Sequence, residues 1–104
     1  MSVYLQATIE VRTGGMTKFC VAMEMIVEIM TEAGWTLYGG FIHQTGRINT
    51  AVDIWEMPDA NAMESGFRFL VEHPNFGEVE KLLEDAVVSE SLVLLNAAPF
   101  FKAK

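Results

Sequence analysis

Alternation of hydrophobic and polar residues predicts strands at the start, in the middle and near the end of the chain. In residues 2–12 every second position is apolar, and these positions are Val3, Leu5, Ala7, Ile9 and Val11. Such alternation is typical of a strand with one buried face. Residues 89–97 contain an unbroken apolar run at positions 92–95. That run indicates a last strand covered on both sides.

Residues 34–58 predict two strands joined by a tight turn at Thr45-Gly46, where glycine supplies a positive φ. A two-residue turn and a four-residue loop give the same register, whereas a three-residue loop would shift it. The expected cross-strand pairs are His43 with Ile48, Phe41 with Thr50, Gly39 with Val52 and Tyr38 with Asp53. This register puts His43 and Asp53 on opposite faces of the sheet.

Helical spacing of apolar residues predicts helices over residues 16–33, 60–72 and 76–87. Asp59 is a candidate N-cap for the second of them. The order of elements is then strand, helix, strand, strand, two helices, strand. It indicates an α+β fold of the ferredoxin-like βαββαβ type, a four-stranded antiparallel sheet with helices on one face. We expect residues 1–104 to form a single domain.

The composition of the chain favours one kind of binding partner and argues against others. Hydrophobic residues make up 51% of the chain, and the predicted sheet has one face without helices, so we expect a homodimer in which two sheets meet. The net charge of −7 argues against binding to nucleic acid or to an anionic membrane. No apolar stretch reaches the ~20 residues of a membrane span. The single cysteine, Cys20, excludes an internal disulfide and favours the cytoplasm; its apolar neighbours predict a buried thiol.

Asp53 is the most anomalous residue, because it lies in an apolar segment that predicts a central strand. On the expected register it faces Tyr38. The pair is interpreted either as a structural hydrogen bond or as a general base beside a hydroxyl donor. His43 is a second candidate base, with a pKa suited to neutral pH, or else simply an exposed residue. The histidines show no metal-binding spacing, so no metal is expected.

Four stretches resemble the NIPSNAP group of the dimeric α/β-barrel superfamily: residues 9–12, 37–40, 49–56 and 73–76. The most specific is Asn49-Thr-Ala-Val-Asp-Ile-Trp-Glu56. The resemblance implies a dimeric barrel in which each subunit has a cleft between sheet and helices. The chain departs from the family pattern at Asp53, where histidine is usual. It also departs from related cyclases, which carry a catalytic histidine shortly after a His-Pro like His73-Pro74; Asn75 and Phe76 follow here.

The resemblance leaves several functions open. Our leading hypothesis is a cofactor-independent lyase, isomerase or cyclase that acts by acid–base chemistry on a small, partly apolar molecule. The alternatives are a non-catalytic domain that binds a metabolite or partner, and a haem-binding monooxygenase with His73 or His43 as axial ligand. The candidate catalytic residues are Asp53, Tyr38 and His43, and the candidate substrate-binding residues are Phe41, Thr50, Phe67, Leu70 and Arg47.

Overall fold

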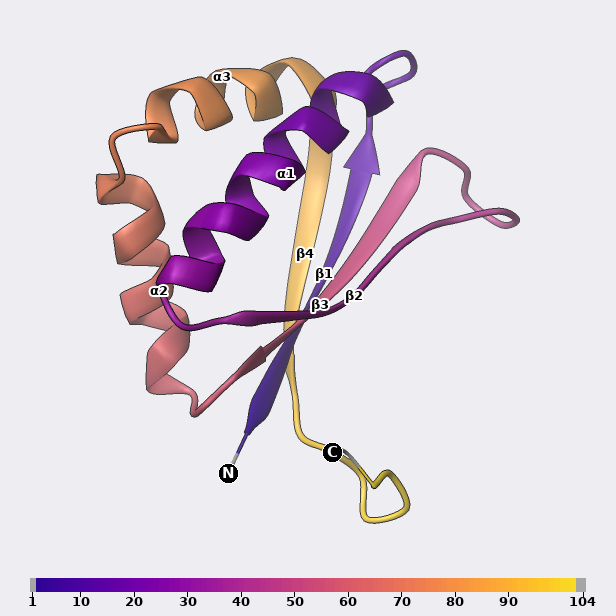
Figure 1. Cartoon of the computed structure of the whole chain (residues 1–104). Coiled ribbons are helices and arrows are strands. Elements are labelled where there is room, and N and C mark those ends of the chain that lie inside the picture. The colour runs from indigo at the N-terminus through magenta and orange to yellow at the C-terminus, as the bar shows by residue number, and fades with distance from the viewer. Residues whose placement is uncertain (1, 103–104) are drawn as a thin grey trace.

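A computed structural model describes residues 2–102 and has a four-stranded antiparallel sheet with three helices on one face (Figure 1). The elements are β1 (Val3–Val11), α1 (Met16–Glu32), β2 (Thr36–Ile42), β3 (Thr50–Met57), α2 (Asn61–Glu72), α3 (Phe76–Ala86) and β4 (Val87–Leu95). The strand order is β2-β3-β1-β4, so β1 and β3 are central. The predicted ferredoxin-like βαββαβ fold is therefore confirmed.

The core lies between the helices and the alternating inner positions of β1 and β3. Leu5, Trp55 and Met57 are each at most 3% exposed and pack against residues of α1. The Asp59 carboxylate accepts the backbone N–H of Ala62 at 3.1 Å, which satisfies one of the free donors at the start of α2. The pattern of alternation in residues 2–12 thus predicted the buried face correctly.

The register predicted for the hairpin was wrong. Phe41 lies opposite Val52 and Gly40 opposite Asp53, so the partner of Phe41 lies two positions beyond the predicted Thr50. The cause is a longer connection over residues 43–49, in which Gly46 has φ 79° and Asn49 has φ 60°. The backbone N–H of His43 donates to the carbonyl of Thr50 at 2.8 Å and closes this loop.

The hairpin also contains a β-bulge between Leu37 and Gly39, which the sequence did not predict. Because the extra residue reverses the alternation, Leu37 pairs with Trp55 on the helix side, and the Tyr38 ring contacts Tyr4 at a centroid distance of 5.5 Å. Gly39 also lies under the ring of Phe41, where an added Cβ would come within 2.7 Å of a ring carbon.

Two further predictions concern burial, of Cys20 and of β4, and the single chain differs from both. Cys20 is exposed rather than buried, because it lies on the side of α1 that lines an open hollow beside β2. Most of β4 is also exposed in a single chain, although its apolar run predicted cover on both sides. Within residues 2–102, no helix is long and apolar enough to cross a membrane.

Gly66 is expected to be indispensable in α2. A Cβ at this position would lie 2.4 Å from the indole nitrogen of Trp35, a ring that is only 3% exposed. Gly66→Ala should therefore destabilise the protein by about 1–3 kcal/mol through overpacking, although alanine favours a helix. Thermal or urea unfolding measures this change.

Gly77 in α3 is the matched control, because an added Cβ there meets nothing within 4 Å. Gly77→Ala should raise the free energy of unfolding by up to about 1 kcal/mol. Equal stability of the two variants would contradict the close packing of α2 on Trp35.

Candidate functional site

Asp53 lies in the middle of the sheet and points toward the helices. Its neighbours across the strands are Ala7 in β1 and Gly40 in β2, two small residues that leave space around the carboxyl group. The residue is 7% exposed. Trp55, two positions along the same strand and therefore on the same face, donates its indole N–H to Asp53 Oδ2 at 2.6 Å.

Burial and this hydrogen bond act on Asp53 in opposite directions. Loss of solvation raises the pKa of the carboxyl group, and the Trp55 N–H, which favours the charged form, lowers it by less. The net result is a pKa above the ordinary value for aspartate. A carboxylate of this kind is a stronger base than an exposed one, which suits it to removing a proton.

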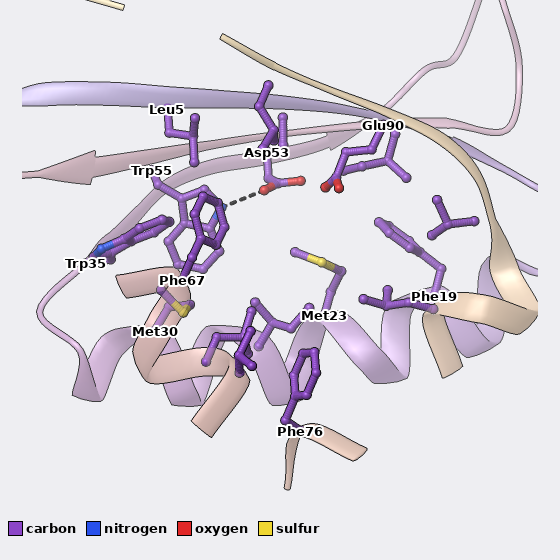
Figure 2. A pocket seen from close by; sticks show the side chains of 18 residues that line it. Leu5, Phe19, Met23, Met30, Trp35, Asp53, Trp55, Phe67, Phe76 and Glu90 are labelled. Atoms are coloured by element: carbon purple, nitrogen blue, oxygen red, sulfur yellow. Dashed lines mark hydrogen bonds between the residues drawn. The ribbon is translucent and has the colours of Figure 1, made fainter. Parts of the chain in front are cut away.

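Asp53 opens into a cavity of about 320 Å³ between the sheet and the three helices (Figure 2). The lining is mostly aromatic and aliphatic, and the two tryptophans contact each other edge to face at a centroid distance of 5.8 Å. The residues that surround the cavity include Phe19, Met23, Trp35, Trp55, Phe67, Leu70 and Phe76. An apolar cavity with few polar groups is the usual form of a small-molecule site.

Glu90 is the second carboxyl group at this cavity, and no pattern in the sequence indicated it. It lies in β4 opposite Ile9 of β1, on the same face as Leu92, which also lines the cavity. Burial raises the pKa of Glu90 first, and the negative charge of Asp53 raises it further. The residue as a whole is exposed on its edge strand, but its carboxyl end lies over the cavity (Figure 2). The local environment of that end determines the pKa.

A second hollow of about 300 Å³ lies between α1 and β2. Asp53, Phe19 and Met23 line both hollows, so the carboxyl group can be approached from two sides of α1. Phe41 lies at this second hollow and is 62% exposed. The structure thus separates Phe41 from Phe67 and Leu70, which line the main cavity.

Tyr38 does not join Asp53. The predicted pair was wrong because the bulge turns Tyr38 to the sheet face without helices, where it contacts Tyr4 and Phe101. The hydrogen-bond partner of Asp53 is Trp55, a role that the sequence did not indicate. Trp55 is itself 3% exposed.

Three other candidate residues lie outside both hollows. His43 is in the hairpin loop, where its Nδ1 is 2.9 Å from the carbonyl oxygen of Arg47. The Arg47 guanidinium is exposed and 3.6 Å from Glu10. Thr50 is buried at 3% exposure, but its partner in β1 is Glu10, on the face opposite to Asp53.

The cavity residues do not fit a haem group. Neither His43 nor His73 lines the cavity, and His73 Nδ1 instead accepts the backbone N–H of Asn75 at 3.1 Å. In the described part of the chain, no imidazole, thiolate or phenol side chain lines the cavity, and its methionines, Met23 and Met30, have no histidine there to complete a Met/His pair of axial ligands. Within residues 2–102, no three His, Cys, Asp or Glu side chains gather as metal ligands would.

Comparison with known proteins identifies the family of the chain. The NIPSNAP family model matches residues 4–101. An uncharacterised NIPSNAP-like domain protein from Burkholderia xenovorans has a TM-score of 0.84 at 19% identity, with 98% of this chain and 90% of that chain covered. A NIPSNAP family protein from Agrobacterium tumefaciens has a TM-score of 0.85 at 15% identity, with 96% of each chain covered.

A cofactor-independent oxygenase from Streptomyces nogalater shares the fold at 13% identity, with a TM-score of 0.71 and 98% of each chain covered. The search of curated proteins found no match. The identities are low, so these structures establish the fold and leave the chemistry to the site itself.

Proposed function

Because the chain belongs to the NIPSNAP family, we propose that it is a cofactor-independent enzyme that transfers protons on a small, partly apolar molecule in the cytoplasm. The observation that carries this proposal is Asp53, a residue only 7% exposed whose carboxyl group opens into an apolar cavity. Such burial is costly for stability, and functional sites are where proteins retain such costs. The lone cysteine favours the reducing compartment.

In the proposed reaction Asp53 removes a proton from an acidic carbon or hydroxyl of the bound molecule. Trp55 keeps the carboxylate oriented, and Phe67 and Leu70 contact the apolar part of the ligand. Proton transfer by Asp53 requires no bound cofactor, and a cofactor-independent oxygenase from Streptomyces nogalater shares the fold. Lyase, isomerase and cyclase reactions all contain such a proton transfer.

A panel of aromatic and carbonyl metabolites, scored both for binding and for turnover, tests this function. We expect at least one compound to be converted by the parent protein and left unconverted by Asp53→Asn. Compounds that bind in the cavity without conversion by either protein would favour a non-catalytic binding domain instead.

We also propose that the protein is a homodimer in which the two open sheet faces meet. Apolar residues on that face are unusually exposed, with Tyr38 at 48% and Val93 at 48%. Val93 lies opposite Gln6 of β1, which alternation assigns to the face without helices. A second copy of the same sheet would cover these residues and the exposed strand β4.

Light scattering should therefore give a mass of about twice the 11.6 kDa of one chain. Val93→Glu should shift the mass toward the monomer, since it puts a charge into the proposed interface. Val21→Glu is the control, because Val21 is similarly exposed at 44% but lies on α1. A parent protein that is monomeric at micromolar concentration would contradict the dimer.

A further inference from the structure

We propose that Glu90 is the acid partner of Asp53, and that the two carboxyl groups select uncharged apolar carbonyl compounds with an acidic α-hydrogen. This inference rests on the proposed function of the same cavity and deepens it in two ways. It assigns a catalytic role to a residue of the edge strand, and it names the chemical class of the substrate.

The sheet brings the two groups together across one strand. Asp53 of β3 pairs with Ala7 of β1, and Glu90 of β4 pairs with Ile9 of β1, so the two acids flank β1 on the helix side. Ala7 is small, and its side chain leaves the space between them open. Figure 2 shows both carboxyl groups turned toward the same part of the cavity. A bound molecule can therefore contact both.

The surroundings of the two carboxyl groups differ and favour different roles for them. Asp53 Oδ2 accepts the Trp55 N–H at 2.6 Å, a contact that favours the ionised form. This is the one hydrogen bond between the side chains drawn in Figure 2, so Glu90 has no donor among them. The charge of Asp53 also opposes ionisation of Glu90 and raises its pKa. We therefore assign the role of base to Asp53 and the role of proton donor to Glu90.

This division of roles fits enolisation of a ketone. The Asp53 carboxylate takes the α-proton as the C–H bond breaks. The electron pair of that C–H bond then forms a carbon–carbon double bond. The carbonyl oxygen receives the proton of the Glu90 carboxyl group and becomes the enol hydroxyl. The products are the enol, a protonated Asp53 and an ionised Glu90, so protons and electrons balance. Return of a proton to the same carbon gives hydrogen exchange, and in a substrate whose enol is conjugated with a second double bond, return to the far end of that system completes an isomerisation.

The ionisable residues that line the cavity determine which charge a substrate can carry. Asp53 and Glu90 are its only ionisable lining residues within the described chain, and no Lys, Arg or His accompanies them. An anionic substrate would be repelled by the ionised Asp53, and no cation would compensate. The aromatic and aliphatic walls favour a flat, apolar skeleton, for which 320 Å³ is adequate space.

Deuterium exchange tests the proposal with defined probes. The probes are uncharged cyclic ketones, from cyclohexanone to 2-tetralone, incubated with the protein in D2O and followed by proton NMR. We expect the parent protein to accelerate loss of the α-hydrogen signal of 2-tetralone above the rate in buffer. The ring-matched anion, 6-carboxy-2-tetralone, should exchange at the rate in buffer.

Substitutions at Glu90 and at a control residue then test the role of Glu90 separately from that of Asp53. Glu90→Gln should lower the enzymatic exchange rate by about tenfold or more, since general acid catalysis contributes at least that much. The control is Glu56→Gln, which removes a carboxylate from the opposite face of the sheet, where Glu56 pairs with Tyr4. It should exchange at the parent rate. Unfolding curves confirm that each variant is folded.

The possible failures are distinguishable. Parent-like exchange by Glu90→Gln, with loss in Asp53→Asn, would overturn the role of Glu90 and leave the proposed function standing. Exchange of the anionic ketone as fast as 2-tetralone would overturn the substrate class. No acceleration of any ketone by the parent protein would overturn the role of Asp53 in enolisation, and this inference with it.

Discussion

Asp53→Asn is expected to lower turnover by about 10²-fold or more while the fold survives. Asparagine keeps the size of the side chain, and its carbonyl oxygen can still accept the Trp55 N–H. The substitution removes basicity alone, so no proton can be taken from the substrate. Rates measured on the compound found by the panel, or on 2-tetralone, give the comparison directly.

The same substitution should stabilise the protein at neutral pH. Because the pKa of Asp53 is raised in the folded state, the folded protein holds its proton more tightly than the unfolded chain. Stability is then greatest at a pH below the unfolded pKa and decreases as the pH rises through that value and the raised folded one. The advantage of Asp53→Asn over the parent should therefore be larger at pH 7 than at pH 4.

Urea unfolding at the two pH values measures this difference. Glu56→Gln is again the control, because it removes a charge from the same strand on the other face. An Asp53→Asn protein that is less stable than the parent at pH 7, and equally active, would mean that the carboxylate serves packing alone.

Trp55→Ala is expected to cost about 3–5 kcal/mol of stability, the usual loss for truncating a large aromatic side chain in a core. The indole is 3% exposed and contacts Trp35 at 5.8 Å between ring centroids, so its removal leaves a cavity beside a second ring. It also removes the only hydrogen-bond donor to Asp53 among the residues described. Thermal unfolding should show a large decrease in Tm.

Trp55→Phe separates the two contributions of this residue. Phenylalanine retains much of the apolar contact but donates no hydrogen bond, so the loss of stability should be smaller. The pKa of Asp53 should rise further, because burial would then act without the opposing contact. A Tm for Trp55→Ala equal to that of the parent would contradict the central position of β3.

The sequence predicted the fold well because alternation and helical spacing are local signals. Residues 2–12 and the three helices each have a clear apolar face, and the structure confirms these elements with ends shifted by a few residues. The hairpin register was harder to predict, since it depends on the length of the connection and on a bulge. Residues 43–49 and the extra residue at Tyr38 changed the partner of Asp53.

The site was predicted only in part for the same reason. Three of the predicted site residues do line one cavity: Asp53, Phe67 and Leu70. Asp53 could be identified because it is a lone acid in an apolar strand. Glu90 was missed, although it alternates with Leu92 and lies on the same face. Its importance arises from the strand order, which puts β4 next to β1, and strand order is not a local property of the sequence.

The measurement that bears most on the proposed function is a carboxyl-carbon NMR titration of Asp53. The proposal is that the fold holds this carboxyl group in a cavity where ionisation is costly, so that it can take up a proton from a bound molecule. We predict that Asp53 titrates clearly above its ordinary value of 3.8, and that Glu90 titrates above 4.5 in the same experiment. An Asp53 that titrates at or below 3.8 would contradict the account.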